Sequence, residues 1–342
     1  MDSPIELLNL QETQEDRVLT FEPETFDQYL GQEEIKSKLK VYVTACNLRK
    51  ENLDHILLFG PPGLGKTTLA KVIAKELGAT FRITSAPVLE RSGDLVAILS
   101  NLQEREILFI DEIHRLPKNV EEILYSAMEN FAVDMIIGQG AGAKSIRLPL
   151  KSFTLIGATT RTSLISGPLQ TRFGIVERLD FYDSESLAEI VKQNANFLNV
   201  PILPEATFEI GKRARGTPRI VKRIFRRVRD FAQVKGYEVI NKEIVDIALN
   251  FLDIDEDGLN KLDRKVLAHI IKDFDGGPVG LDTLAAMTGE DRDSLEDVCE
   301  PYLIRMGLLQ KTTRGRQINP KKYLSLRKKL LGENIIEQKA IF

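Results

Sequence analysis

The sequence contains no tryptophan, two cysteines and three histidines among its 342 residues. Cys46 and Cys299 lie far apart and lack neighbours at metal-ligand spacing, which argues against a disulfide framework or a zinc site. No apolar run approaches the roughly 18 to 20 residues that a membrane-spanning helix needs. The acidic start, Met1 to Glu6, has neither the basic nor the apolar region of a secretory signal, so the cytoplasm is the expected location.

Charges of opposite sign are segregated along the chain, although the formal net charge is only -3. Residues 1–34 hold ten carboxylates and one arginine, whereas residues 211–229 hold nine basic side chains and no acid. A second basic stretch runs from Lys311 to Lys329. Such runs form solvated helix faces more often than polyanion contacts, so charge alone assigns no nucleic-acid site.

A glycine-rich loop, Gly60 to Thr67, follows the apolar run Ile56–Phe59 and opens into a helical pattern. Glycines let successive backbone N–H groups converge on a polyphosphate, and the dipole of the next helix favours its negative charge. Lys66 would reach the outer phosphates, and the Thr67 hydroxyl would hold Mg²⁺. A simple turn is the alternative, but it does not need this set of glycines before Lys-Thr.

Short apolar runs alternate with helical patterns through the first half of the chain. This alternation predicts a parallel α/β sheet. The expected strands cover residues 55–59, 81–84, 107–110, 153–157 and 175–181.

Helical patterns replace strands from residue 184 onward and predict a small helical domain. After an acidic, turn-like stretch at residues 252–258, further helical patterns and a hairpin around Thr312–Gly315 predict a winged helix. The expected helices cover residues 184–197, 204–214, 217–235, 241–250, 261–272, 281–287 and 292–306. We therefore expect a large domain over residues 1–182, a helical domain over 183–253 and a winged-helix domain over 254–342.

Paired carboxylates, Asp111 and Glu112, end the apolar run Ile107–Ile110. Ligands of open α/β sheets bind at strand ends. Asp111 would support Mg²⁺, and Glu112 would polarise the attacking water. Two acids at a turn are common, and it is the upstream phosphate loop that favours a hydrolase.

Hydroxyls and an arginine follow downstream. Thr159 and Thr160, after the run Phe153–Gly157, are suited to sensing a terminal phosphate or positioning water, although they can also simply end a strand. The glycine-flanked loop 167–174 projects Arg172. A guanidinium from a neighbouring subunit would neutralise charge that develops during phosphoryl transfer, and this role requires an oligomer.

In this order the motifs, together with residues 216–219 at the start of a helix, resemble those of the AAA+ ATPases. Longer matches at residues 60–70, 109–116, 157–161, 276–285 and 300–304 resemble the RuvB family of bacterial Holliday-junction branch-migration motors, over residues 21–316. The resemblance implies an AAA+ fold with a helical lid and a winged-helix domain. It also implies an ATPase that uses ATP and Mg²⁺ to move duplex DNA, the partners RuvA and RuvC, and a hexameric ring.

The resemblance also implies roles for single residues, carried over by position. Arg172 is the finger that acts in trans, Arg219 the second sensor, and Thr159 or Thr160 the first. The residues implied in catalysis are Lys66, Asp111, Glu112, Thr159, Thr160 and Arg172. Those implied in nucleotide binding are Phe21, Glu22, Tyr29, Leu30, Gly60, Gly63, Gly65, Lys66, Thr67, Thr68, Glu129, Asn130, Phe131, Arg172, Tyr182 and Arg219, with Thr67 and Asp111 on the metal.

Two departures from the family pattern affect these roles. The family usually has Arg-Pro where this chain has Glu22 and Pro23, which weakens a side-chain contact at position 22. It also has Arg-Asp-Arg-Phe-Gly where this chain has Gln170 to Gly174, which leaves Arg172 as the finger candidate.

A projecting β-hairpin is expected near residues 133–148, where apolar runs flank a glycine-rich tip. Exposed Ile136 and Ile137 would be a liability unless they dock a partner, and the resemblance implies that this partner is RuvA. The alternative is a hairpin that packs on its own domain.

Basic residues at the wing predict contacts with DNA phosphates or the minor groove. Arg314 and Arg316 lie at the hairpin tip, Lys311 is nearby, and Arg292 opens a helix. Such contacts hold duplex without reading its sequence. Wings of this composition also occur in protein-binding modules.

The favoured interpretation is therefore a soluble AAA+ motor that drives branch migration. The alternative is a clamp-loader-like protein, switched by nucleotide, that binds DNA without sustained transport. The hairpin and the winged helix discriminate, because the usual clamp loader ends in a helical collar. A protein unfoldase is disfavoured because no aromatic pore-loop sequence is present.

Overall fold

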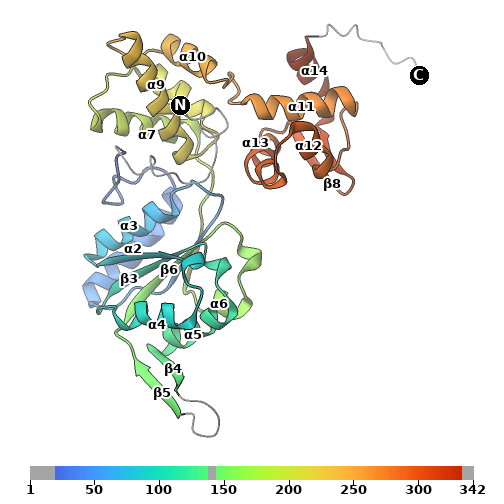
Figure 1. The fold of residues 1–342 in the computed structure, drawn as a ribbon. Coiled ribbons are helices and arrows are strands. Elements are labelled where there is room, and N and C mark those ends of the chain that lie inside the picture. The colour runs from blue at the N-terminus through green and yellow to red at the C-terminus, as the bar shows by residue number, and fades with distance from the viewer. Residues whose placement is uncertain (1–19, 138–143, 333–342) are drawn as a thin grey trace. The chain divides into compact units, whose positions relative to one another are not determined.

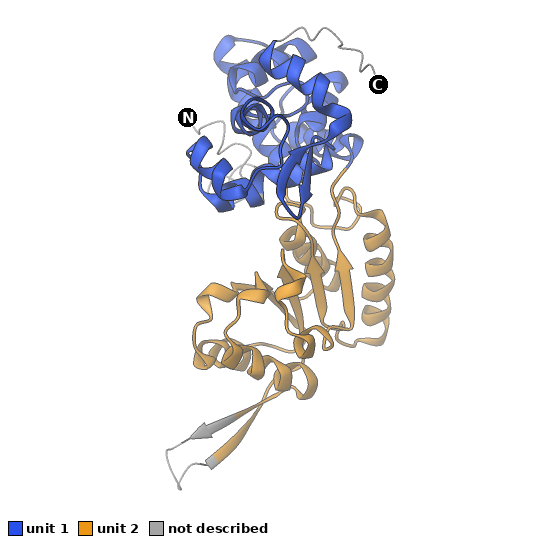
Figure 2. Cartoon of the chain, turned by 90° about the vertical axis from the view of Figure 1, so that its right-hand side faces the viewer, with its two compact units in different colours: residues 1–18, 183–342 blue, residues 19–182 orange. Residues whose placement is uncertain are grey.

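The computed structural model describes residues 20–137 and 144–332, except for the side chains of residues 135–137, 144 and 297. Backbone contacts divide the chain into two compact units, which meet in sequence between Tyr182 and Asp183 (Figure 2). The unit that ends at Tyr182, labelled unit 2 and orange in Figure 2, holds a parallel sheet and is called the first unit here. The unit that begins at Asp183, labelled unit 1 and blue in Figure 2, is mainly helical and is called the second unit (Figure 1).

Five parallel strands form the sheet of the first unit. They are β1 (Ile56–Phe59), β2 (Phe81–Ser85), β3 (Glu106–Asp111), β6 (Phe153–Thr159) and β7 (Ile175–Arg178). Their order is β2-β3-β6-β1-β7, which confirms the predicted parallel α/β sheet. The inner strands β3, β6 and β1 are apolar and buried along nearly their whole length, as expected of strands between two helical layers.

The register of the strands defines two opposite edges of the sheet. Phe59 lies beside Thr159, and Ser85 lies beside Asp111, so the carboxyl ends of β1, β3 and β6 share one edge. The amino ends, at Ile56 and Phe153, lie at the other edge. The carboxyl edge is therefore where ligand-binding residues of this fold class gather.

Strand β7 is shorter than predicted, since the ladder ends at Arg178 rather than at residue 181. Its neighbour β1 ends at Phe59, where the chain turns at Gly60. Beyond the backbone bond that Leu179 N–H donates to Phe59, the register gives β7 no further partner in β1.

Helices surround this sheet. In α5 the buried residues Val120, Leu124, Ala127 and Met128 recur at helical spacing and form one apolar face. The α-helices are α2 (Glu33–Arg49), α3 (Lys66–Leu77), α4 (Ser92–Ser100), α5 (Lys118–Asn130) and α6 (Gly167–Gln170), and short 3₁₀ turns are η2 (Ala86–Val88), η3 (Ile113–Arg115) and η5 (Thr162–Leu164).

A separate antiparallel pair, β4 (Ala132–Ile137) and β5 (Lys144–Pro149), extends from the first unit (Figure 1). Ala132 pairs with Pro149 and Asp134 with Arg147, which defines a hairpin. The side chains of Ile136 and Ile137 lie outside the described residues, so their predicted role stays a prediction.

Four helices follow Asp183 in the second unit. They are α7 (Ser184–Phe197), α8 (Pro204–Arg213), α9 (Pro218–Lys235) and α10 (Lys242–Phe251). Asp183 caps α7 by accepting from the Ser186 N–H, and proline occupies the first turn of α8 and α9, where its missing N–H costs nothing.

The rest of the second unit has the winged-helix pattern predicted from the sequence. Its elements are α11 (Lys261–Asp273), α12 (Leu281–Thr288), η6 (Ser294–Cys299), α13 (Glu300–Arg305), β8 (Leu309–Thr312), β9 (Gly315–Ile318), η7 (Pro320–Lys322) and α14 (Tyr323–Leu331). The helix expected over residues 292–306 is split into the π-helical η6 and the α-helical α13. Pro301 explains the change, because it cannot donate to a preceding carbonyl and is tolerated only in a first helical turn.

A buried ion pair joins the four-helix segment to the winged helix within this unit. Arg215 precedes α9, is 4 % exposed, and donates to the Asp263 carboxylate of α11. Its Nε also donates to the Gly258 carbonyl at 3.1 Å, and its guanidinium stacks on the Tyr302 ring at 4.5 Å. Such a pair ties two segments firmly, because losing either partner would leave a buried charge uncompensated.

Across the described ranges, no helix combines the length and the apolar character that crossing a membrane would require.

Candidate nucleotide site and DNA interface

The loop between β1 and α3 has the backbone geometry of a phosphate cradle. Gly60 and Gly65 have φ angles of 139° and 95°, which side chains rarely adopt. A Cβ at Gly60 would lie 2.4 Å from the Leu179 carbonyl oxygen. Gly65 directly precedes α3, so the unbonded N–H groups of that helix face the loop and favour an anion.

Lys66 lies over this loop. Its side chain is nearly buried, and Nζ donates to the carbonyls of Gly60 at 2.9 Å and Pro61 at 3.0 Å. The ammonium is thus held where a polyphosphate would enter. Thr67 and Thr68 follow in the first turn of α3, which puts both near the same anion position.

The acid pair lies at the same sheet edge. Asp111 ends β3, and its Oδ1 accepts from the Glu112 N–H at 2.9 Å. Glu112 has a φ of 49°, an uncommon backbone conformation for a side chain of this type. This turn ends the strand and allows Glu112 to reach Thr160, which directly follows β6.

Two polar side chains contact Glu112, and a third contacts one of these two. Its Oε2 accepts from Thr160 Oγ1 at 3.2 Å and lies 3.2 Å from His114 Nδ1. The same Nδ1 lies 2.9 Å from Oγ1 of Thr159, which is fully buried at the end of β6. The predicted acid and both predicted hydroxyls therefore lie together, and His114 joins them.

Sequence reasoning missed His114. Burial lowers its pKa below the usual histidine value, with Glu112 opposing the effect, so the ring is neutral at pH 7. An ionised carboxylate can only accept, so Nδ1 must carry the proton for a bond to Glu112 to form. The available signal was its position just after Asp111 and Glu112 in the sequence.

Two tyrosines, Tyr29 and Tyr182, pack against the end of the phosphate loop. Tyr182 donates to Tyr29 Oη at 3.1 Å and to the Leu64 carbonyl at 3.4 Å. Burial raises the pKa of both hydroxyls, that of Tyr182 to about 12. A Cβ at Gly31 would strike the Tyr182 ring at 2.3 Å. Tyr29 and Tyr182, predicted at the adenine, thus contact the loop backbone at Gly65 and Leu64. Leu30, which follows Tyr29 in sequence, is half-buried.

Glu22 has a partner of its own. Its carboxylate bonds to Lys71 Nζ of α3 at 2.8 and 3.0 Å, and the pair is exposed. Phe21 is half-buried. The ion pair engages the Glu22 side chain, which accords with the weaker nucleotide contact expected at this position.

Arg172 is held away from the phosphate loop of its own chain. It donates to Glu129 Oε1 at 3.0 Å and stacks on the Tyr125 ring at 4.5 Å. The adjoining Gly174 lies against Asp54, which precedes β1 at the amino edge of the sheet. Arg172 therefore belongs to the sheet edge opposite Lys66.

The segment Glu129–Phe131 lies at the same amino edge. The Phe131 ring is 5.9 Å from that of Phe153, at the start of β6, and 6.4 Å from that of His55, just before β1. Glu129 pairs with Arg172, and Asn130 ends α5 between them. A nucleotide contact through this segment would consequently involve a nucleotide held by another copy.

Arg219 lies in the first turn of α9, after Thr217 and Pro218. Its side chain is half-buried. The helix begins at Pro218, one residue after the start expected from the sequence.

Three of the four predicted DNA contacts lie on the surface. Lys311 pairs with Glu296 at 3.0 Å and Arg292 with Asp282 at 3.0 Å, both exposed, and Arg314 is exposed at the turn between β8 and β9. Exposed ion pairs of this kind contribute little to stability, so breaking them would cost little.

Arg316 requires a correction. Its side chain points inward from β9, is 9 % exposed, and bonds to both carboxylate oxygens of Glu300 in α13. The alternation of the strand directs Arg316 into the domain, so it fixes the wing to α13 and is not available to DNA.

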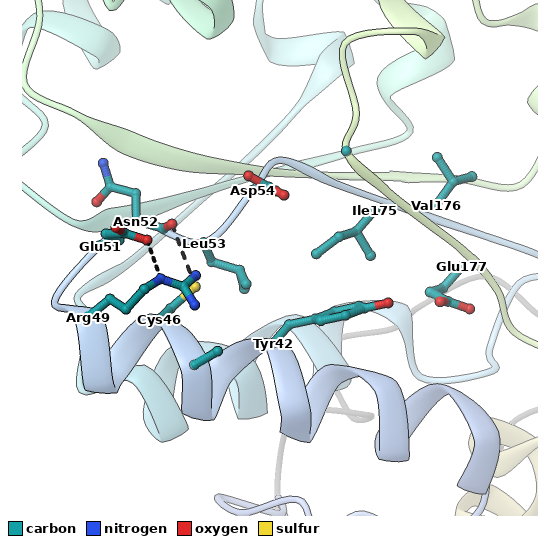
Figure 3. A pocket seen from close by; sticks show the side chains of 12 residues that line it. Tyr42, Cys46, Arg49, Glu51, Asn52, Leu53, Asp54, Ile175, Val176 and Glu177 are labelled. Atoms are coloured by element: carbon teal, nitrogen blue, oxygen red, sulfur yellow. Dashed lines mark hydrogen bonds and ion pairs between the residues drawn. The ribbon is translucent and has the colours of Figure 1, made fainter.

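A cavity of about 590 Å³ lies apart from these residues, between α2 and β7 (Figure 3). Tyr42, Cys46, Asp54 and Glu177 line it, and Arg49 pairs there with Glu51. None of the residues predicted for nucleotide or DNA lines this cavity.

The parallel sheet carries a phosphate loop, an acid pair and polar side chains at its strand ends, and a helical segment and a winged helix follow it. This combination defines a P-loop AAA+ ATPase with a C-terminal winged-helix domain. Three family models match in succession: the Holliday junction DNA helicase RuvB P-loop domain over residues 21–179, the RuvB AAA lid domain over 182–255 and the RuvB C-terminal winged helix domain over 256–327. The chain belongs to the RuvB family, whose members are ATP-driven motors of Holliday-junction branch migration.

Solved structures agree with this assignment. The chain resembles the Holliday junction branch migration motor RuvB of Thermotoga maritima at 46% identity and a TM-score of 0.79, with 92% of this chain and 99% of that chain covered. A variant of the same Thermotoga protein matches at 47% identity and a TM-score of 0.80, covering 90% of this chain and 99% of that one. The winged helix, which was expected to distinguish this family from the clamp loaders, is present.

Proposed function

We propose that this chain works as a ring of copies, and that each ATP is hydrolysed between the phosphate loop of one copy and Arg172 of the next. The observation that carries the proposal is the position of Lys66 and Arg172 at opposite edges of one sheet. A single copy cannot bring both groups to one phosphate, whereas two copies in head-to-tail contact can.

Within one copy, Lys66 would neutralise the outer phosphates. Thr68 and the backbone N–H groups in the first turn of α3 would bind the inner phosphates. The residues also fit Mg²⁺, because Thr67 and Asp111 supply hard oxygen donors. No cluster of three or more acidic, histidine or cysteine ligands occurs among the described residues, as suits an ion bound mainly by phosphates and water. Bound there, Mg²⁺ would balance charge on the transferring phosphoryl group.

Glu112 would act as the base that orients water, with Thr159 and Thr160 sensing the phosphate. Glu112 Oε2 is already occupied by its bond from Thr160 and its contact with His114. The other carboxylate oxygen would then accept from the attacking water. Arg219 would respond to the same nucleotide as the second sensor.

The winged helix would hold duplex DNA at a four-way junction through Arg292, Lys311 and Arg314. The hairpin of β4 and β5 would dock RuvA through Ile136 and Ile137, RuvC would act at the resolution step, and the ring would be a hexamer in the cytoplasm. These assignments rest on membership of the family and on the exposure of the basic side chains.

Arg314→Ala is expected to weaken binding of any duplex and to lower the salt dependence of the affinity, because one phosphate contact is lost. The slope of log affinity against log salt should fall by roughly 1. Fluorescence anisotropy with two unrelated duplexes across a salt series measures both. Arg316→Ala is the matched control: it should lower the melting temperature, since it leaves Glu300 buried without its cation. Unchanged DNA affinity in Arg314→Ala would remove that residue from the interface.

Branch migration itself tests the proposal. A labelled four-way junction is mixed with RuvA, ATP, Mg²⁺ and this chain, and its conversion to duplex arms is followed. Lys66→Ala and Arg172→Ala should each abolish conversion, whereas His269→Ala, which changes a half-buried side chain of α11, should not. Full conversion by Arg172→Ala would end the shared-site proposal.

A further inference from the structure

Glu112, His114, Thr159 and Thr160 lie together at the carboxyl edge of the sheet. His114 is the member of this group that has no role in the family motifs described above. Only 7 % of its side chain is exposed, although it lies in the short turn η3. Its Nδ1 faces Glu112, the proposed water-orienting acid, and Thr159, the proposed sensor, at the same time.

The packing of the adjacent residue, Ile113, against β6 places His114 in this position. The neighbouring Ile113 is buried, and a Cβ at Gly157 of β6 would lie only 2.9 Å from its Cδ1. Glycine at position 157 thus lets the turn η3 lie directly on β6. For that reason His114 reaches Thr159, which lies two residues after Gly157 on β6.

The contacts of Thr159 leave its hydroxyl well defined. Its Oγ1 accepts from the Arg161 N–H at 3.0 Å and lies 2.9 Å from His114 Nδ1. With the proton on Nδ1, the imidazole donates to both Oγ1 of Thr159 and Oε2 of Glu112. One N–H group therefore connects the sensor strand with the acid.

We propose that His114 is a positioning residue for ATP hydrolysis: its Nδ1–H holds Oε2 of Glu112 against the end of β6, so that the other carboxylate oxygen is aimed at the attacking water. This inference rests on the proposed roles of Glu112 and Thr159. It adds that the orientation of the Glu112 carboxylate depends on contact with Thr159 at the end of β6.

Asparagine and glutamine at position 114 separate positioning from simple space filling. Asparagine places an amide near the Nδ1 position of histidine, whereas glutamine places it near Nε2. We expect His114→Ala and His114→Gln to lower kcat for ATP about 10- to 100-fold, the usual effect of a misplaced catalytic group. KM and the affinity for a fluorescent ATP analogue should stay within about 3-fold, and His114→Asn should keep kcat within about 5-fold of the parent.

A combined variant removes the remaining ambiguity. If His114 acts through Glu112, then His114→Ala should not slow a Glu112→Gln chain further, because effects of groups that act as a unit do not add. His269→Ala serves as the histidine control and should hydrolyse ATP normally.

Three results would overturn the inference: normal kcat in His114→Ala, equal loss in His114→Asn and His114→Ala, or further slowing of Glu112→Gln by His114→Ala. Full hydrolysis by Glu112→Gln alone would instead refute the proposed role of Glu112, and would withdraw the basis of the inference with it.

Discussion

Arg172→Ala chains mixed with Lys66→Ala chains should recover ATP hydrolysis that neither variant shows alone. Loss of an arginine finger lowers turnover about 10³-fold or more, and loss of the phosphate-loop lysine is expected to be similarly severe. In a mixture, however, an Arg172→Ala copy brings an intact loop and a Lys66→Ala neighbour brings an intact arginine. With random assembly at equal amounts, about a quarter of the contacts would pair the intact halves.

Steady-state phosphate release from the separate and mixed variants, in the presence of junction DNA, measures this recovery. The control is a chain carrying both substitutions, which should rescue neither single variant because it supplies no intact half. If co-assembled single variants remain inactive, or if Arg172→Ala alone hydrolyses ATP normally, the arginine is not shared between copies.

Arg215→Ala is expected to destabilise the second unit by roughly 3–5 kcal/mol, because it leaves the Asp263 carboxylate buried without its cation. Asp263 is 1 % exposed and also accepts from the Asn260 N–H at the start of α11. Urea unfolding followed by circular dichroism and tyrosine fluorescence measures the loss, and Tyr302, stacked on Arg215, is a local reporter.

Asp263→Asn tests the pair from its other side, since asparagine can still accept from the Asn260 N–H. The combined Arg215→Ala and Asp263→Asn variant should cost clearly less than the sum of the single variants. Lys192→Ala breaks an exposed pair with Glu189 and should leave unfolding unchanged. Additive losses would show that Arg215 and Asp263 do not stabilise each other.

The sequence was sufficient for features that local chemistry determines. Glycines at fixed spacing before Lys66, and an apolar strand ending in Asp111, each have few structural interpretations, and both led to the correct sheet edge. The parallel sheet was predictable for a similar reason, because β1, β3 and β6 are buried on both faces and are almost wholly apolar.

Contacts between distant residues were not predictable in this way. Arg316 and Arg314 are two positions apart at one hairpin, yet the pairing of Arg316 with Glu300 depends on how the wing packs against α13. The pair of Glu22 with Lys71 and the position of His114 beside Thr159 likewise depend on tertiary packing. Composition marks such residues as charged or polar but does not state which neighbour they meet.

The contacts of Tyr182 have a mechanical consequence. Tyr182 is the last residue of the first unit, and its ring rests on Gly31 while its hydroxyl donates to Leu64 in the phosphate loop. Nearby, Gln32 donates to the Asp180 carbonyl at 2.7 Å. The point where the chain leaves the first unit is therefore fixed to the backbone of the phosphate loop, so a change in the conformation of that loop would act first on Tyr182.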